Sequence, residues 1–153
     1  TERETKFLYF KKKNTPILLQ REDIRFDLFW EKIISTIFSE GMKERIESVY
    51  EFSNFIVKVI SPEDLIITKC ATERAGDRID AAEIIKKANI NWDIIIKESV
   101  YQAKVTPYLF PVFLFDFLYE LKEDLKADIP KKVILDVRKI AEDMLVERVK
   151  KKK

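Results

Sequence analysis

The sequence contains no histidine and only one cysteine, Cys70, among its 153 residues. The absence of histidine excludes Ser-His-Asp and Cys-His nucleophile systems, histidine general bases and zinc sites with histidine ligands. A single cysteine can form neither an intramolecular disulfide nor a Cys-only zinc site, and it favours a reducing, cytoplasmic location. Any metal chemistry must therefore use carboxylate oxygens, which favour magnesium or manganese.

The sequence also lacks a dominant charge and a long apolar run. Its 29 Lys and Arg residues nearly cancel its 27 Asp and Glu residues. This balance gives no DNA-specific signal and none for a membrane surface. The most apolar stretch, residues 108–121, is shorter than the roughly 20 residues of a membrane-spanning helix and contains Asp116. We therefore expect a soluble cytoplasmic protein, and its abundant Ile, Lys and Glu resemble hyperthermophile composition.

Apolar residues recur with different periods in the two halves of the chain. Alternation over residues 24–28 predicts a half-buried strand, and Ser53-Asn54 predicts the turn of a hairpin. A helical spacing is expected over residues 30–38, with Gly41 as its C-terminal cap. The fold class predicted is α+β, with a small mixed β-sheet over residues 1–60 and a helical region over residues 61–153 packed on it as a single compact domain.

The helical half begins with a strong start signal. Ser61 is an N-cap candidate, and Pro62 suits the first helical position. Asn91 is the expected cap of a later helix, and Ile129-Pro130 precedes an amphipathic pattern with Leu145 on its inward face. Residues 61–153 are therefore expected to form a series of helices.

Two short motifs carry a family resemblance. Ser61-Pro62-Glu63-Asp64-Leu65 is followed by Lys69 and by Arg74-x-x-Asp77-x-x-Asp80, and Arg25-Phe26-Asp27-Leu28-Phe29 precedes them. Across about residues 17–95 this order resembles uncharacterised bacterial and archaeal nucleotidyltransferase-like proteins, in the part that follows their catalytic sheet.

The resemblance implies a two-metal mechanism in the complete family fold. A Gly-Ser turn at a helix N-terminus holds the nucleotide phosphates, while an Asp-x-Asp pair and a third carboxylate hold two divalent ions, magnesium or manganese. Asp27 matches the third carboxylate, which would make it a catalytic residue and a metal ligand. Some such proteins belong to toxin–antitoxin pairs, which implies a protein or RNA partner.

The sequence departs from this family pattern at its most important elements. Neither glycine, Gly41 or Gly76, is followed by serine, and no Asp-x-Asp pair lies upstream of Asp27. Both missing elements would precede Thr1 in the family order, so the chain is interpreted either as a fragment or as a degenerate relative. We expect it to be catalytically incomplete and to bind no cofactor by itself.

The candidate site residues each have a structural interpretation beside the functional one. Asp27 is either a metal ligand or a solvated carboxylate on a sheet face. Glu63 and Asp64 are better explained by the positive end of a helix dipole than by catalysis. Four further charged residues either line a nucleotide-facing surface or tie two helices together: Lys69, Arg74, Asp77 and Asp80.

The aromatic segment from Val105 to Leu118 is apolar around its whole circumference, so it must be surrounded. It is either a central core helix or a contributor to a homodimer, and we expect the chain to self-associate as a twofold dimer. Two function classes remain at this point: a nucleotidyltransferase-like protein, and a helical interaction or regulatory module with no catalytic ancestry.

Overall fold

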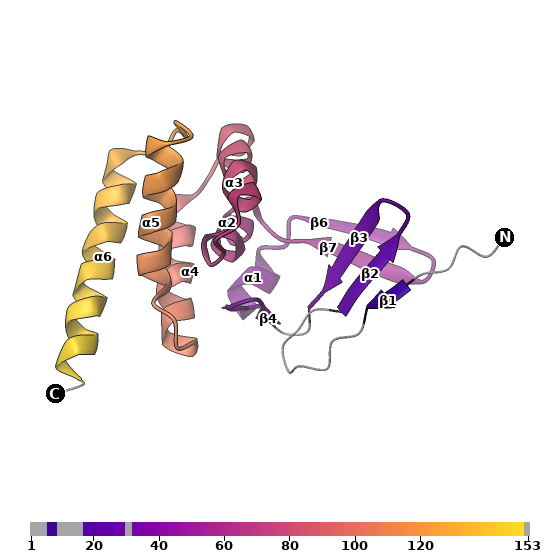
Figure 1. Ribbon diagram of the computed structural model, residues 1–153, viewed down its shortest axis with the longest axis horizontal. Coiled ribbons are helices and arrows are strands. Elements are labelled where there is room, and N and C mark those ends of the chain that lie inside the picture. Colours follow the sequence, from indigo (N-terminus) through magenta and orange to yellow (C-terminus); the bar gives the residue numbers. More distant parts are fainter. Residues whose placement is uncertain (1–5, 9–16, 30–31, 152–153) are drawn as a thin grey trace.

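The computed structural model describes residues 6–8, 17–29 and 32–151, and Figure 1 shows their arrangement. Strands occupy most of the first part of the chain and helices the second, which confirms the expected α+β class. The longer strands lie at one end of the molecule, whereas α5 (Phe110–Glu123) and α6 (Lys131–Lys150) lie at the other.

The strands form three small sheets. Their bounds are β1 (Lys6–Leu8), β2 (Ile17–Arg21) and β3 (Ile24–Leu28), then β4 (Lys32–Ile33) and β5 (Thr36–Ile37), then β6 (Ser48–Phe52) and β7 (Phe55–Val59). In the described part of the chain every pairing is antiparallel, whereas we expected one mixed sheet. The physical reason is the two-residue connections at 22–23, 34–35 and 53–54, because so short a loop can only return the chain antiparallel.

The helix expected over residues 30–38 is wrong, because residues 32–37 form the β4–β5 hairpin; residues 30 and 31 lie outside the described part. Ile34 reverses the chain with a left-handed φ of 58°, which is uncommon for a β-branched residue. Ile33 and Ile37 favour strands for the same branching that lowers helix propensity. An apolar run this short fits both the helical period of 3.6 residues and the strand period of 2, so its spacing did not distinguish a helix from a strand.

Gly41 does not cap a helix at its C-terminus, as we had expected. It lies inside the short helix α1 (Glu40–Glu44), which begins after Ser39. The Ser39 hydroxyl accepts a hydrogen bond from the Met42 amide at 3.1 Å, so Ser39 caps the N-terminus of α1.

Three further helices lead into α5 and α6. Their bounds are α2 (Pro62–Cys70), α3 (Ala75–Lys87) and α4 (Trp92–Val105). The predicted start of α2 is confirmed, because the Ser61 hydroxyl accepts the Asp64 amide at 3.2 Å. Asn91 occupies the N-cap position of α4, but its side chain makes no capping hydrogen bond.

The aromatic segment supplies the centre of the core. Phe110, Leu114 and Phe117 on α5 are buried, and α2, α3, α4 and α6 all contact this helix. The helical half of the same chain therefore covers much of the segment for which a second chain was the alternative, although Val105 and Tyr108 stay 40% and 43% exposed. Leu145 on α6 was expected to point inward but is exposed. In the described part of the chain, no helix is both long enough and apolar enough to cross a membrane.

Candidate functional site

Asp27 lies near the end of β3, on the face of the β2–β3 hairpin that also carries Arg25. The antiparallel register places it opposite Leu18 and on the same face as Arg25 and Gln20. Arg25 binds both of its carboxylate oxygens, through Nε to Oδ1 at 2.6 Å and through Nη2 to Oδ2 at 3.0 Å. This hydrogen-bonded pair raises the pKa of Arg25 above its ordinary value. The carboxylate that the family resemblance assigns to a metal is therefore held by an arginine.

The described residues do not fit a two-ion site. Across residues 6–8, 17–29 and 32–151, no group of three or more histidine, cysteine, aspartate or glutamate side chains is placed to hold a metal ion. Asp27 has a cation, Arg25, on its carboxylate instead of a second acid. The described residues thus offer one carboxylate of the expected set, and no catalytic step follows from it.

The Arg74-x-x-Asp77-x-x-Asp80 motif is brought together with Lys69 by the packing of α2 against α3. Lys69 Nζ lies 2.9 Å from Asp77 Oδ1 and 2.8 Å from Asp80 Oδ2. Asp77 Oδ2 also accepts hydrogen bonds from Thr72 Oγ1 at 2.6 Å and from Arg74 Nε at 3.1 Å. We call these five residues the α2–α3 clasp. Their polar atoms are directed at one another, which supports the structural interpretation of the motif.

The clasp shifts the pKa values of its two least exposed charged members, Lys69 and Asp77. Burial raises the pKa of Asp77, but hydrogen bonds from Thr72 and Lys69 outweigh it, and the pKa is lowered overall. Burial lowers the pKa of Lys69, but hydrogen bonds to Asp80 and Asp77 outweigh it, and that pKa is raised. Both shifts favour the charged forms, as expected for an ion pair that stabilises the fold.

Glu63 and Asp64 have specific partners beyond the helix dipole. The fully buried Asp64 carboxylate accepts two hydrogen bonds from Arg45, and Ser61 Oγ donates to its Oδ2 at 3.0 Å. Glu63 Oε1 accepts the backbone amide of Asn91 at 2.9 Å, which fixes the start of α4 against α2. Both acids of the Ser-Pro-Glu-Asp-Leu motif are therefore structural ties.

Three residues of this network escaped the sequence analysis: Arg45, Glu98 and Gln102. Arg45 Nη2 donates to Glu98 Oε2 at 2.7 Å, and Gln102 Nε2 donates to Glu98 Oε1 at 3.0 Å. Gln102 also exchanges two hydrogen bonds with the backbone of Ile37, at 3.0 Å and 2.7 Å, and so holds β5 against α4. The sequence did contain a signal for two of them. Glu98 and Gln102 lie four residues apart, on the same helical face as the apolar Ile95, and polar residues on a buried face indicate hydrogen-bond partners.

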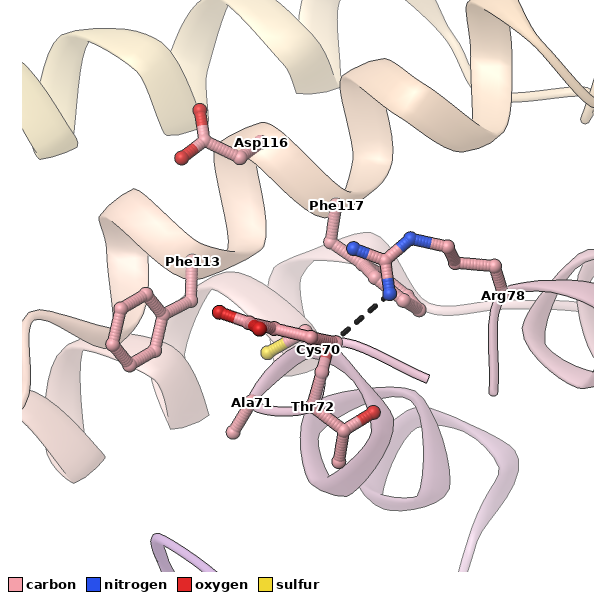
Figure 2. Close-up of a pocket in the computed structure, with 8 residues that line it drawn as sticks. Cys70, Ala71, Thr72, Arg78, Phe113, Asp116 and Phe117 are labelled. Carbon is pink, nitrogen blue, oxygen red and sulfur yellow. Dashed lines mark hydrogen bonds between the residues drawn. The ribbon is translucent and has the colours of Figure 1, made fainter. Parts of the chain in front are cut away.

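A hollow of about 310 Å³ lies where the end of α2 meets α3 and α5. The Arg78 guanidinium carbon lies over the Phe117 ring, 5.6 Å from its centre. Figure 2 shows these two side chains and the hydrogen bond from Arg78 to the Thr72 carbonyl. Arg78 is also held by Glu120 at 2.6 Å. Burial raises the pKa of the adjoining Cys70 thiol to about 12. Burial thus disfavours the thiolate, which is the nucleophilic form of a cysteine.

Comparisons of the chain with protein-family models, with curated proteins and with solved structures find no match.

Proposed function

We propose that this chain is nucleotidyltransferase-like and that its described part is a catalytically incomplete scaffold. The observation that carries the proposal is the position of Asp27, on the polar face of a strand whose other face is apolar. That strand precedes a helix with the Ser-Pro-Glu-Asp-Leu start and a clasp built from Lys69 and Asp77. The order and the local structures agree with the family resemblance, while the single carboxylate explains the incompleteness.

The same resemblance supplies the wider setting that we propose. It includes a cytoplasmic location, a protein or RNA partner of the toxin–antitoxin type, and magnesium or manganese as the ion of the complete active site. Asp27 would contribute one oxygen ligand to that ion. Because Arg25 holds both Asp27 oxygens at 2.6 and 3.0 Å, ion binding at this carboxylate has to compete with the arginine.

Nuclear magnetic resonance with Mn²⁺ tests the role of Asp27. We expect weak, saturable broadening of the β3 amide signals that Asp27→Asn removes and that Arg25→Gln strengthens, because Arg25→Gln removes the competing cation. Asp23→Asn is the matched control, since Asp23 lies in the turn of the same hairpin and is exposed. Broadening that persists unchanged in Asp27→Asn would contradict the assignment.

A transfer assay tests the incompleteness separately. With labelled nucleoside triphosphates and magnesium or manganese, the chain alone should transfer no nucleotide above the level of a no-protein blank. Transfer that disappears in Asp27→Asn would show that the chain holds a complete site, and the scaffold proposal would be wrong.

A second candidate function is a non-enzymatic interaction module. It is favoured by the exposed apolar residues on β2, β3, β6 and β7. The apolar face of an antiparallel sheet is normally packed against other parts of the protein or against a partner. A module of this kind gives no Mn²⁺ effect that depends on Asp27, so the same spectra separate the two candidates.

A further inference from the structure

A basic groove lies where the end of α4, the start of α5 and the end of α6 meet, and we call it the α4–α6 groove. Figure 1 shows these helix ends together, on the half of the molecule away from the longer strands. The groove has a volume of about 560 Å³, compared with about 310 Å³ for the hollow beside Cys70. Its charged lining consists of three cations and one acid: Lys104, Arg148, Lys151 and Glu147. The formal charge of the lining is therefore +2, which equals the net charge of the whole chain.

The three cations of the α4–α6 groove have no acid of their own. Lys104, Arg148 and Lys151 are exposed, and none of them forms an ion pair within the described part of the chain. Lys69 and Arg78, by contrast, are each bound to acids of the fold. The charges of the groove are therefore free to bind an anionic ligand.

The helix ends account for only part of this positive charge. Basic residues are common at helix C-termini, because each C-terminus carries about half a negative charge. α4 and α6 end at the groove, whereas α5 begins there after Leu109, without a side-chain cap and without an acid in its first turn. The three termini together amount to about half a negative charge, which leaves the groove with a positive charge of about 1.5.

An exposed aromatic ring lines the same groove. Tyr108 is 43% exposed and belongs to the loop between α4 and α5. Its backbone amide donates to Thr106 Oγ1 at 3.3 Å, and its ring contacts that of Phe113, with centres 6.3 Å apart. These two contacts hold the ring beside the cations, where it can stack on the flat face of a base.

We infer that the α4–α6 groove binds a single-stranded nucleic acid, with phosphates on Lys104, Arg148 and Lys151 and an unpaired base on Tyr108. The exposure of the three cations disfavours an acidic peptide, because exposed pairs between side chains contribute little. A nucleic acid strand gains its affinity differently. Its phosphates release bound counterions when cations replace them, and this gain does not require the cations to be buried.

A duplex and an anionic membrane fit the groove less well. The bases of a duplex are stacked on one another, so they offer no free face to Tyr108. A bilayer surface is flat over the width of the groove and cannot follow its concave lining, which also includes Glu147. The exposed Val146 and Val149 of α6 would suit a membrane, but they do not line the groove.

This inference goes beyond the function proposed above, because it uses no residue of the family motifs. The RNA partner considered there follows from the resemblance alone, whereas the groove follows from its own charges and from Tyr108. The Mn²⁺ experiment on Asp27 and the binding experiments on the groove can therefore fail separately.

Fluorescence anisotropy of the unmodified chain with a labelled single-stranded RNA of about 12 nucleotides provides the first test. Each phosphate contact on a single strand contributes about −0.7 to the slope of log K against log salt concentration. Three contacts predict a slope of about −2. No measurable binding at low salt, or a slope near zero, would overturn the inference without reference to any variant.

Variants of the cations test their assignment. Lys104→Gln and Arg148→Gln should each reduce the steepness of the salt dependence by about 0.7, because each removes one phosphate contact. Lys139→Gln is the matched control, since Lys139 is an exposed lysine of α6 that does not line the groove. An equal change of slope in all three variants would place the strand elsewhere and overturn the inference.

Tyr108→Ala separates stacking from charge. It should weaken binding of the single strand about fivefold or more and leave the salt slope unchanged, because the ring contributes no charge. Binding of the duplex of the same sequence should not respond. Tyr119→Ala is the control, since Tyr119 is 52% exposed on α5 and does not line the groove. Unchanged affinity of Tyr108→Ala for the single strand would contradict the stacking assignment and overturn the inference.

Two competitors test the other anionic partners. Polyglutamate and vesicles that contain phosphatidylserine should not displace the labelled RNA when each is added at the same concentration of negative charge as unlabelled RNA. Displacement by polyglutamate would indicate an acidic peptide, and displacement by the vesicles would indicate a membrane surface. Either result would overturn the inference.

Discussion

The guanidinium group of Arg45 binds both carboxylate oxygens of Asp64, through Nε to Oδ2 at 3.0 Å and through Nη2 to Oδ1 at 2.7 Å. Asp64 is fully buried at the start of α2, whereas Arg45 follows α1 and is partly exposed. The hydrogen bond to Asp64 is the largest cause of the raised pKa of Arg45. Because Arg45 also binds Glu98 on α4, this one side chain joins the segment before β6 to two helices of the core.

Asp64→Asn should destabilise the protein by about 2 kcal/mol, because it leaves the partly buried Arg45 with one carboxylate instead of two. Urea denaturation of the variant and the unmodified chain measures the difference. Glu40→Gln is the control, since Glu40 pairs with Lys43 at an exposed site and should change stability by less than about 0.5 kcal/mol. If Asp64→Asn lowered the free energy of unfolding by no more than Glu40→Gln does, the Arg45 network would add no measurable stability.

The two glycines should respond in opposite ways to alanine. A Cβ at Gly76 meets no atom within 4 Å, so Gly76→Ala should raise the free energy of unfolding by about 0.5–1 kcal/mol through helix propensity. A Cβ at Gly41 would lie 2.8 Å from Arg45 Nη1, and Arg45 is held by Asp64 and Glu98. Gly41→Ala should therefore gain nothing or destabilise. Thermal unfolding of both variants checks this contrast, and a matching gain at Gly41 would contradict it.

The sequence predicted those parts of the fold whose signals are local. Ser61 and Pro62 placed the start of α2, and the alternation around Phe26 placed β3, because caps and period-2 patterns need no distant partner. The half-burial expected of β3 is wrong, because Ile24, Phe26 and Leu28 are all exposed. The helix expected over residues 30–38 failed because β5 depends on Gln102, 65 residues away, which holds the backbone of Ile37. No local pattern carries that information.

In the candidate site, too, local relationships could be predicted from the sequence and long-range ones could not. Lys69, Asp77 and Asp80 were recognised as a group because they lie within one short motif, and their alternative interpretation as ion pairs matches the contacts observed. The link from Asp64 to Arg45 spans 19 residues and could not be inferred from spacing. Whether Asp27 binds a metal stays a prediction for the Mn²⁺ experiment.

Cys70 should be inert in the folded protein. Its thiol is buried, and burial raises its pKa to about 12, compared with about 8.5 for a free cysteine. At pH 8 we therefore expect iodoacetamide to label the native chain at least 100-fold more slowly than the chain in denaturant. Mass spectrometry of timed samples measures both rates. Native labelling within about tenfold of the unfolded rate would show that the α2–α5 packing around this thiol opens readily.

The α2–α3 clasp should make stability depend on pH in the acid range. The pKa of Asp77 is lowered in the folded state, so its contribution is fully present above its unfolded value of about 3.9 and is lost as pH falls through the folded value. Asp77→Asn should therefore cost about 1.5 kcal/mol at pH 7 and progressively less below about pH 4. Urea denaturation of both chains at pH 7 and at pH 2.5 measures this change.

Asp80→Asn is the matched control for the clasp. Both acids accept a hydrogen bond from Lys69, but the Asp80 side chain is 62% exposed whereas that of Asp77 is 12% exposed. Solvent weakens an exposed pair, so Asp80→Asn should change stability by less than about 0.5 kcal/mol at either pH. If the effect of Asp77→Asn were the same at pH 7 and pH 2.5, its charge would contribute nothing. The clasp would then act through the shape and hydrogen bonding of a neutral side chain.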